Sequence, residues 1–158
     1  MDLFTQLKQE SKEVLLMYIG VSKDRALHAL SVAKKMKELA EDIRPGDLEF
    51  AQDMFSLGIL HDIGYEYSSV QTEHSEIGGN LLRRQGYKYW QEVYYHGRSD
   101  SLYTSLPLKL LNTADLHTDG KGNIVTVQER LNDVKERYGE ESFQYLDFFA
   151  LAKNLDLV

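Results

Sequence analysis

The sequence predicts an all-α protein that folds as a single domain. Apolar residues recur every three or four positions along almost the whole chain of 158 residues, and this spacing is typical of helices with one buried face. Alternation of the kind seen in strands is limited to residues 122–127. A chain of this length with 42% hydrophobic residues can bury a substantial core, but it is short for two domains.

Three helices are expected in the N-terminal part of the chain. Gly20 ends the first, and Ser22 is a favourable N-cap for the second. Pro45 and Gly46 break the chain, after which Asp47 starts the third. These helices are expected over about residues 3–19, 22–41 and 47–61.

Five further helices are expected in the rest of the chain. Gly86 and Gly139 are favourable C-terminal stops, and Pro107 suits a first helical turn. The segment 118–123 is rich in turn-forming residues and is expected to be a loop. The expected helices are one over about residues 72–85, a short one near 89–95, one that begins near 106 and carries Asp115, and two over about 127–138 and 141–154.

The net charge of −7 argues against one broad class of partners. Long nucleic acid is bound by basic surfaces, so it is not expected as a partner, whereas local cations or a metal ion can still hold small anions.

No run of eighteen apolar residues occurs, so no membrane partner is expected. The N-terminus lacks the pattern of a secretory signal and cysteine is absent, which is compatible with a cytoplasmic location. A homodimer is compatible with the sequence, which does not determine the oligomeric state.

Five of the expected helices each carry one histidine or aspartate among apolar residues. These residues lie three, four, seven or eight positions from apolar neighbours, so they point toward the interior with them. Burying one polar group without a partner costs roughly 2 to 7 kcal/mol, and an unpaired carboxylate costs more. A single inward histidine is usually a hydrogen-bonded core residue, but five such groups are explained most economically if they meet around a cation. The five are His28, His61, His74, His96 and Asp115, which leaves His117 as the one histidine outside the group.

The dipeptide His61-Asp62 is a second indication of a site. Adjacent helical residues point about 100° apart, so both side chains reach one metal ion only where a helix ends. Ile63-Gly64 follows directly and supplies such an end, because Gly64 is free to adopt a left-handed conformation. Alone the dipeptide is weak evidence for a metal site, because His-Asp also occurs by chance. Together with the other inward residues it is strong evidence.

The order and context of these residues resemble the motifs of the HD-domain metal-dependent phosphohydrolases. The H…HD…D pattern of that family is present as His28, His61-Asp62 and Asp115. The segments similar to its first two motifs are Arg25-x-x-His28-x-x-x-Val32-Ala33 and Leu60-His61-Asp62-Ile63-Gly64.

Two further histidines make the chain similar to a subset of that family with six ligands and a dinuclear centre. Residues 73–79, which include His74, resemble the H-x-x-x-G segment of the YqeK-type dinucleoside tetraphosphate hydrolases. His96 falls where those enzymes have their last histidine. The resemblance covers about residues 22–119. We therefore expect residues 1–158 to form a single HD-type domain with a C-terminal helical extension over about 124–158.

The resemblance implies a helical bundle with two metal ions at its centre. Asp62 would bridge the two ions, with the first completed by His28, His61 and Asp115 and the second by His74 and His96. Two positions depart from the family pattern. Tyr65 stands where many relatives have a lysine, and residues 116–119 replace an arginine-containing segment of the YqeK type, so the dinucleotide substrate does not carry over directly.

The expected function is hydrolysis of a phosphoester or phosphoanhydride in a nucleotide or another small phosphorylated metabolite. Six nitrogen and oxygen ligands exceed the four of a structural zinc site, and imidazole mixed with carboxylate suits Fe, Mn, Co, Ni or Zn as divalent or trivalent ions. A metal-activated water would be the nucleophile. Asp62 would act by bridging the ions, and Arg25 and Arg98 would hold a second phosphate.

Three alternatives stay open on the sequence. A di-iron oxygenase uses the same six ligands, so its chemistry cannot be separated from hydrolysis at this level. A non-catalytic signalling or binding module would keep the fold around a vestigial site, although the intact ligand positions argue against it. A purely structural metal site is disfavoured by the number of ligands.

Overall fold

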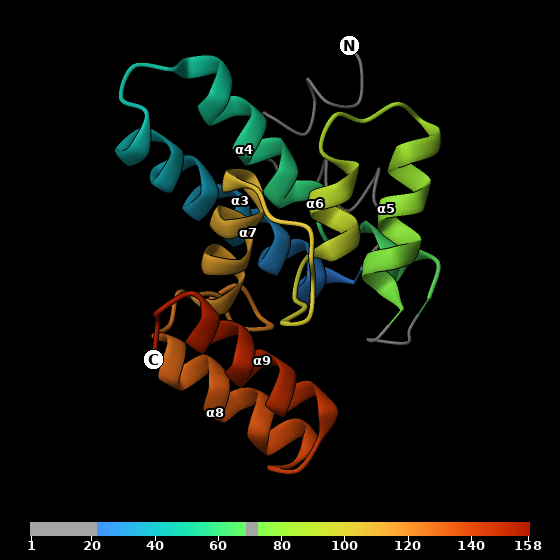
Figure 1. Cartoon of the computed structure of the whole chain (residues 1–158), viewed down its shortest axis with the longest axis vertical. Helices are drawn as coiled ribbons and strands as arrows, with labels where there is room; N and C mark the ends of the chain where they lie inside the picture. The colour runs from blue at the N-terminus through green and yellow to red at the C-terminus, as the bar shows by residue number, and fades with distance from the viewer. Residues whose placement is uncertain (1–21, 69–72) are drawn as a thin grey trace.

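The computed structural model describes residues 22–68 and 73–158, and these residues form an all-α, single-domain fold, as predicted. The described residues contain seven α-helices and one short 3₁₀ helix, and Figure 1 labels the α-helices. The helix expected over residues 3–19 lies outside them. The elements are α3 (Lys23–Ile43), α4 (Leu48–Leu60), η1 (Ile63–Glu66), α5 (His74–Arg84), α6 (Trp90–Tyr95), α7 (Leu106–Leu116), α8 (Val127–Tyr138) and α9 (Phe143–Asn154).

The caps expected from the sequence start two of these helices. The Ser22 side chain accepts a hydrogen bond from the backbone N–H of Arg25, and the Asp47 side chain accepts one from Phe50. Ser105, Thr126 and Ser142 cap α7, α8 and α9 in the same way. The strand-like segment 122–127 forms no strand: one isolated antiparallel bridge, between Thr118 and Ile124, is its only β-pairing. Side-chain caps therefore begin five of the seven α-helices of the described residues.

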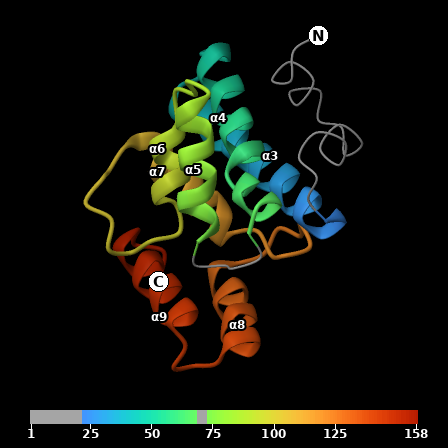
Figure 2. The ribbon, with the colours of Figure 1, turned by 90° about the vertical axis from the view of Figure 1, so that its right-hand side faces the viewer.

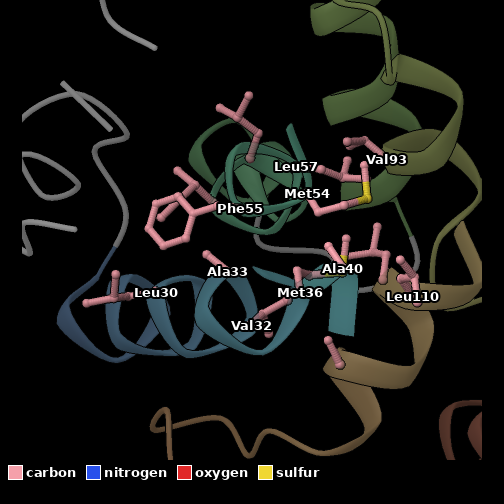
Figure 3. Close-up of a cluster of buried hydrophobic side chains, with 14 of the residues drawn as sticks. Leu30, Val32, Ala33, Met36, Ala40, Met54, Phe55, Leu57, Val93 and Leu110 are labelled. Atoms are coloured by element: carbon pink, nitrogen blue, oxygen red, sulfur yellow. The ribbon is translucent and has the colours of Figure 1, made fainter. Parts of the chain in front are cut away.

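The main core lies where α3, α4 and α7 pack together, as the close-up in Figure 3 shows. Gly58 of α4 is essential to this packing, because a Cβ there would lie 2.5 Å from the Cα of Ala33 on α3. The two backbones therefore approach each other more closely than larger residues allow. The core side chains include Val32, Met36, Met54, Leu57, Ile59, Leu60, Val93 and Leu111, all of them buried.

Helices α8 and α9 form a hairpin below the rest of the bundle in both ribbon views (Figures 1 and 2). It has a small apolar cluster of its own, made by Leu116, Val127, Leu131, Leu151 and Ala152. Because Leu116 belongs to α7, this cluster joins the hairpin to the end of the helix that carries Asp115. The hairpin thus lies beside the region where the inward polar residues meet. Among the described residues, no helix is long and apolar enough to cross a bilayer.

Candidate metal centre

The structure brings together the side chains of all six predicted metal ligands. One oxygen of Asp62, Oδ2, lies 3.6 Å from Nε2 of His28 and 3.3 Å from Nε2 of His61. Asp115 closes the same group, because its Oδ1 lies 3.0 Å from His28 Nε2 and 3.9 Å from His61 Nε2. Helices α3, α4 and α7 therefore converge on one side of Asp62.

The other oxygen of Asp62 faces a second group of imidazoles. Its Oδ1 lies 3.2 Å from Nε2 of His74 and 3.3 Å from Nε2 of His96. The two histidine nitrogens are 3.2 Å apart. Donor atoms of His28, His61 and Asp62 lie within 4.8 Å of one another, as do those of Asp62, His74 and His96. Asp62 is the member common to both groups.

The chain reaches this arrangement through the end of α4. His61 is the C-cap of α4, and Asp62 is the N-cap of the 3₁₀ helix η1, so the backbone turns between two adjacent site residues. Gly64 does not adopt the left-handed conformation expected from the sequence, because it lies within η1 and is not among the glycines with positive φ. Its role is a close contact: a Cβ on Gly64 would lie 1.8 Å from the carbonyl oxygen of His74. The glycine therefore lets η1 pack against the start of α5, which carries His74.

Backbone carbonyls orient three of the four histidines. His28 Nδ1 lies 2.8 Å from the carbonyl oxygen of Asp119, His61 Nδ1 lies 2.6 Å from that of Gly58, and His96 Nδ1 lies 2.6 Å from that of Val93. A carbonyl can only accept, so Nδ1 carries the hydrogen in each case. When the ring is neutral, this leaves the Nε2 lone pair facing the centre, which is the usual arrangement of a metal-binding histidine.

Burial and mutual charge shift the acid–base behaviour of the centre. Burial lowers the pKa of His61, but the Asp62 and Asp115 carboxylates and the Gly58 carbonyl outweigh it and raise the pKa to about 9. Burial raises the pKa of Asp62, but charged His61 and hydrogen bonds from the surrounding imidazoles hold it well below its ordinary value. The pKa of Asp115 is likewise lowered, mainly by His28 despite burial.

The donor set fits a metal ion. His61 is fully buried, and its Nε2 makes no hydrogen bond within the described part of the chain, although Asp62 Oδ2 is near. A buried polar atom without a partner is costly, and imidazole nitrogens with carboxylate oxygens are typical transition-metal donors. The buried group could therefore hold a metal ion.

The two arginines predicted to bind phosphate lie at a cavity of about 600 Å³ beside the centre. Nη1 of Arg25 is 3.7 Å from Asp62 Oδ2, and its guanidinium lies over the Tyr65 ring at 3.4 Å from the centroid. Arg98 pairs with Glu76 at 2.9 Å. Arg25 thus directly neighbours the centre, whereas the contact of Arg98 is with an acidic side chain of α5.

Sequence reasoning missed the contribution of the C-terminal hairpin. Arg130 of α8 is buried, lines the cavity and has its Nη2 4.0 Å from Asp115 Oδ1. A signal was present, because Arg130 follows Val127 by three positions and precedes Val134 by four, and so shares their apolar face. The Asp119 carbonyl could not have been found in this way, because any residue can supply a backbone carbonyl.

Comparison with known proteins agrees with this geometry. The sequence profile of the HD domain family matches residues 25–155, a range that includes the whole of α9. No curated protein and no solved structure matches the chain. The matched region contains all six residues of the centre. The chain therefore belongs to the HD domain family, a superfamily made up mostly of metal-dependent phosphohydrolases.

Proposed function

We propose that this protein is a dinuclear metal-dependent phosphohydrolase that acts on a nucleotide or another small phosphorylated metabolite. The observation that supports the proposal is that the two carboxylate oxygens of Asp62 face two different sets of imidazoles. A single mononuclear site would need only one of these sets. Three of the six donor residues lie on α3, α5 and α7, and the other three directly follow the ends of α4 and α6, so five helices serve to bring them together.

His28, His61, Asp62 and Asp115 would hold the first ion, and Asp62, His74 and His96 the second. When bound, such ions supply a water nucleophile of lowered pKa and offset the charge of the phosphoryl oxygens. The protein holds the imidazoles in the required tautomer through the carbonyls behind them. Five of the six ligand residues are also buried, and burial strengthens the attraction between charged groups.

Arg25 is the residue best placed to bind the substrate phosphate at this centre. Its side chain is 38% exposed, lines the cavity and has its Nη1 3.7 Å from Asp62 Oδ2. Stacking on Tyr65 restricts the side chain, so less conformational entropy is lost when an anion binds. Arg98 lines the same cavity, but a substrate must compete with Glu76 for it. We therefore assign the larger share of phosphate binding to Arg25.

Phosphate release across a panel of nucleotides and small phosphoesters tests the proposed function. The purified protein is first analysed for metal, then reconstituted with the metal found and assayed with and without oxygen. We expect release that requires the metal and is indifferent to oxygen. Arg25→Gln should lower kcat/KM about tenfold or more without loss of metal. The exposed Arg84→Gln on α5 removes the same charge outside the cavity and should have no effect.

Two outcomes would overturn the hydrolase assignment. A protein with both metals bound that releases phosphate from none of the panel would be a binding or signalling module. Oxygen-dependent oxidation of a substrate without phosphate release would identify the di-iron oxygenase alternative.

A further inference from the structure

One face of α8 forms a wall of the cavity beside the metal centre. Four residues of α8 are spaced so that they share one helical face. All four line the cavity: Arg130, Val134, Arg137 and Tyr138. Two of them are arginines that have no role in the proposed metal chemistry.

Arg130 is the more unusual of the two, because its charge is buried. The residue is only 8% exposed, and its Nε makes no hydrogen bond within the described residues. Its other nitrogens reach carboxylates: Nη1 lies 3.3 Å from Asp133 Oδ2 and Nη2 lies 4.0 Å from Asp115 Oδ1. Burial of an incompletely paired guanidinium is expensive, and an anionic ligand in the cavity would complete its pairing.

Arg137 is held next to Arg130 by the same carboxylate. Nη2 of Arg137 lies 3.3 Å from Asp133 Oδ2, the oxygen that also contacts Arg130. The guanidinium also packs against the loop that follows α7, because a Cβ on Gly120 would lie 2.8 Å from Nη2 of Arg137. Asp133 thus positions two guanidinium groups with one carboxylate, and Asp115, the other carboxylate near Arg130, is also a proposed metal ligand.

We propose that Arg130 and Arg137 form a subsite for a second phosphoryl group, so that the substrate is a phosphoanhydride rather than a monophosphate ester. This inference rests on the proposed function and names the class of its substrate. The reacting phosphoryl group lies at Asp62 and Asp115, next to Arg25, so Arg25 binds this group and not the second phosphate expected from the sequence. The neighbouring phosphoryl group lies along α8, where two guanidinium groups match its charge and oxygen geometry. A monophosphate would leave Arg137 without an anionic partner from the substrate.

The reaction is hydrolysis of the anhydride bond, with no oxidation or reduction. The oxygen of water forms a bond to the reacting phosphorus while the bond from that phosphorus to the bridging oxygen breaks. The bridging oxygen leaves with the second phosphoryl group, and the proton lost by water passes to solvent. Negative charge develops on the leaving phosphate, and Arg130 and Arg137 stabilise it there.

Binding of two unreactive phosphonates to the metal-loaded protein tests the subsite. Isothermal titration calorimetry compares methylenediphosphonate with methylphosphonate after free metal has been removed. We expect the wild type to bind the diphosphonate at least about tenfold more tightly. Arg137→Gln should reduce the diphosphonate affinity about tenfold and leave methylphosphonate within about twofold. Arg84→Gln, outside the cavity, should change neither value.

Arg137 is the main test position because its side chain is 46% exposed and its replacement is not expected to unfold α8. Arg130→Lys provides a second test that keeps the charge but removes the planar geometry, and it should also lower the diphosphonate affinity selectively. An unchanged affinity ratio in Arg137→Gln would overturn the subsite.

The same preparations separate this inference from the proposed function. Release of phosphate from monophosphates, with an unchanged affinity ratio in Arg137→Gln, would keep the hydrolase and overturn the subsite. A selective loss of diphosphonate binding in a protein that hydrolyses no phosphorylated compound would keep the subsite and overturn the hydrolase.

Discussion

Nε2 of His28 lies 3.0 Å from Oδ1 of Asp115, although α3 carries the histidine and α7 the aspartate. These helices pack against each other in the core, so the same apolar contacts that fold the bundle also close the first group of ligands. Loss of packing between α3 and α7 should therefore separate the two donors. Fold stability and metal affinity are expected to be linked, because ligand binding stabilises only the folded state.

Gly64→Ala should destabilise the fold and impair the second group of ligands. Its Cβ would lie 1.8 Å from the His74 carbonyl oxygen, so η1 or the start of α5 must move. We expect a loss of about 3 kcal/mol in the free energy of unfolding, near the upper end for overpacking, together with loss of metal. Urea denaturation and elemental analysis measure the two effects.

Gly86→Ala is the control for this substitution. Gly86 has φ of +74°, but a Cβ there meets nothing within 4 Å. The variant should lose only about 1 kcal/mol, the cost of the left-handed backbone, and should keep its metal. A Gly64→Ala protein as stable as Gly86→Ala would refute the close contact as the reason for glycine.

Metal affinity should rise with pH between 7 and 9. The pKa of His61 is about 9 in the metal-free protein, so this imidazole is protonated at neutral pH and must lose its proton before it can bind metal. One displaced proton predicts an affinity about tenfold higher for each pH unit gained in that range. Competition with a chelator of known pH dependence measures the effect.

The metal-free protein should show the opposite trend in stability. Because folding raises the pKa of His61, its contribution is full below the ordinary value of 6.5 and is lost as the pH rises to about 9. A metal affinity independent of pH, with flat metal-free stability over the same interval, would show that His61 is neutral throughout.

The free energy of unfolding of Glu92→Gln, relative to that of the wild type, should increase as the pH rises from about 4.5 to 7. Glu92 is 4% exposed, and burial raises the pKa of its carboxyl, although Tyr103 donates hydrogen bonds to both carboxylate oxygens. A raised pKa means that the wild type loses stability as this group ionises, whereas glutamine does not titrate. Thermal unfolding of the two proteins across this range compares them. A difference that shrinks with increasing pH would contradict the raised pKa.

The sequence predicted which side chains would converge where helical periodicity constrains their direction. His28, His74, His96 and Asp115 each share a face with apolar residues, and burying that face leaves their side chains little freedom of direction. Ser22 and Asp47 fixed helix starts in the same local way. Such features depend on neighbours three or four residues away, which a single sequence displays directly.

Features that depend on distant packing escaped sequence reasoning. Gly64 was correctly associated with the end of α4, but its contact with the His74 carbonyl depends on how η1 meets α5. The pairing of Arg130 with Asp115 depends in the same way on the place of the α8–α9 hairpin beneath the bundle (Figure 2). No local pattern fixes the distance between elements that are far apart in the chain.

The metal content of the wild type and of Asp62→Asn tests the central claim most directly. Asparagine keeps the shape of the side chain but removes its charge and one carboxylate oxygen, so it should not bridge two ions. We expect elemental analysis to find two ions per wild-type chain and at most one in the variant. His117→Ala, a histidine outside the centre whose Nδ1 contacts the Thr113 carbonyl, should retain both. Two ions retained in Asp62→Asn, or none in a wild type offered excess metal, would contradict a centre bridged by Asp62.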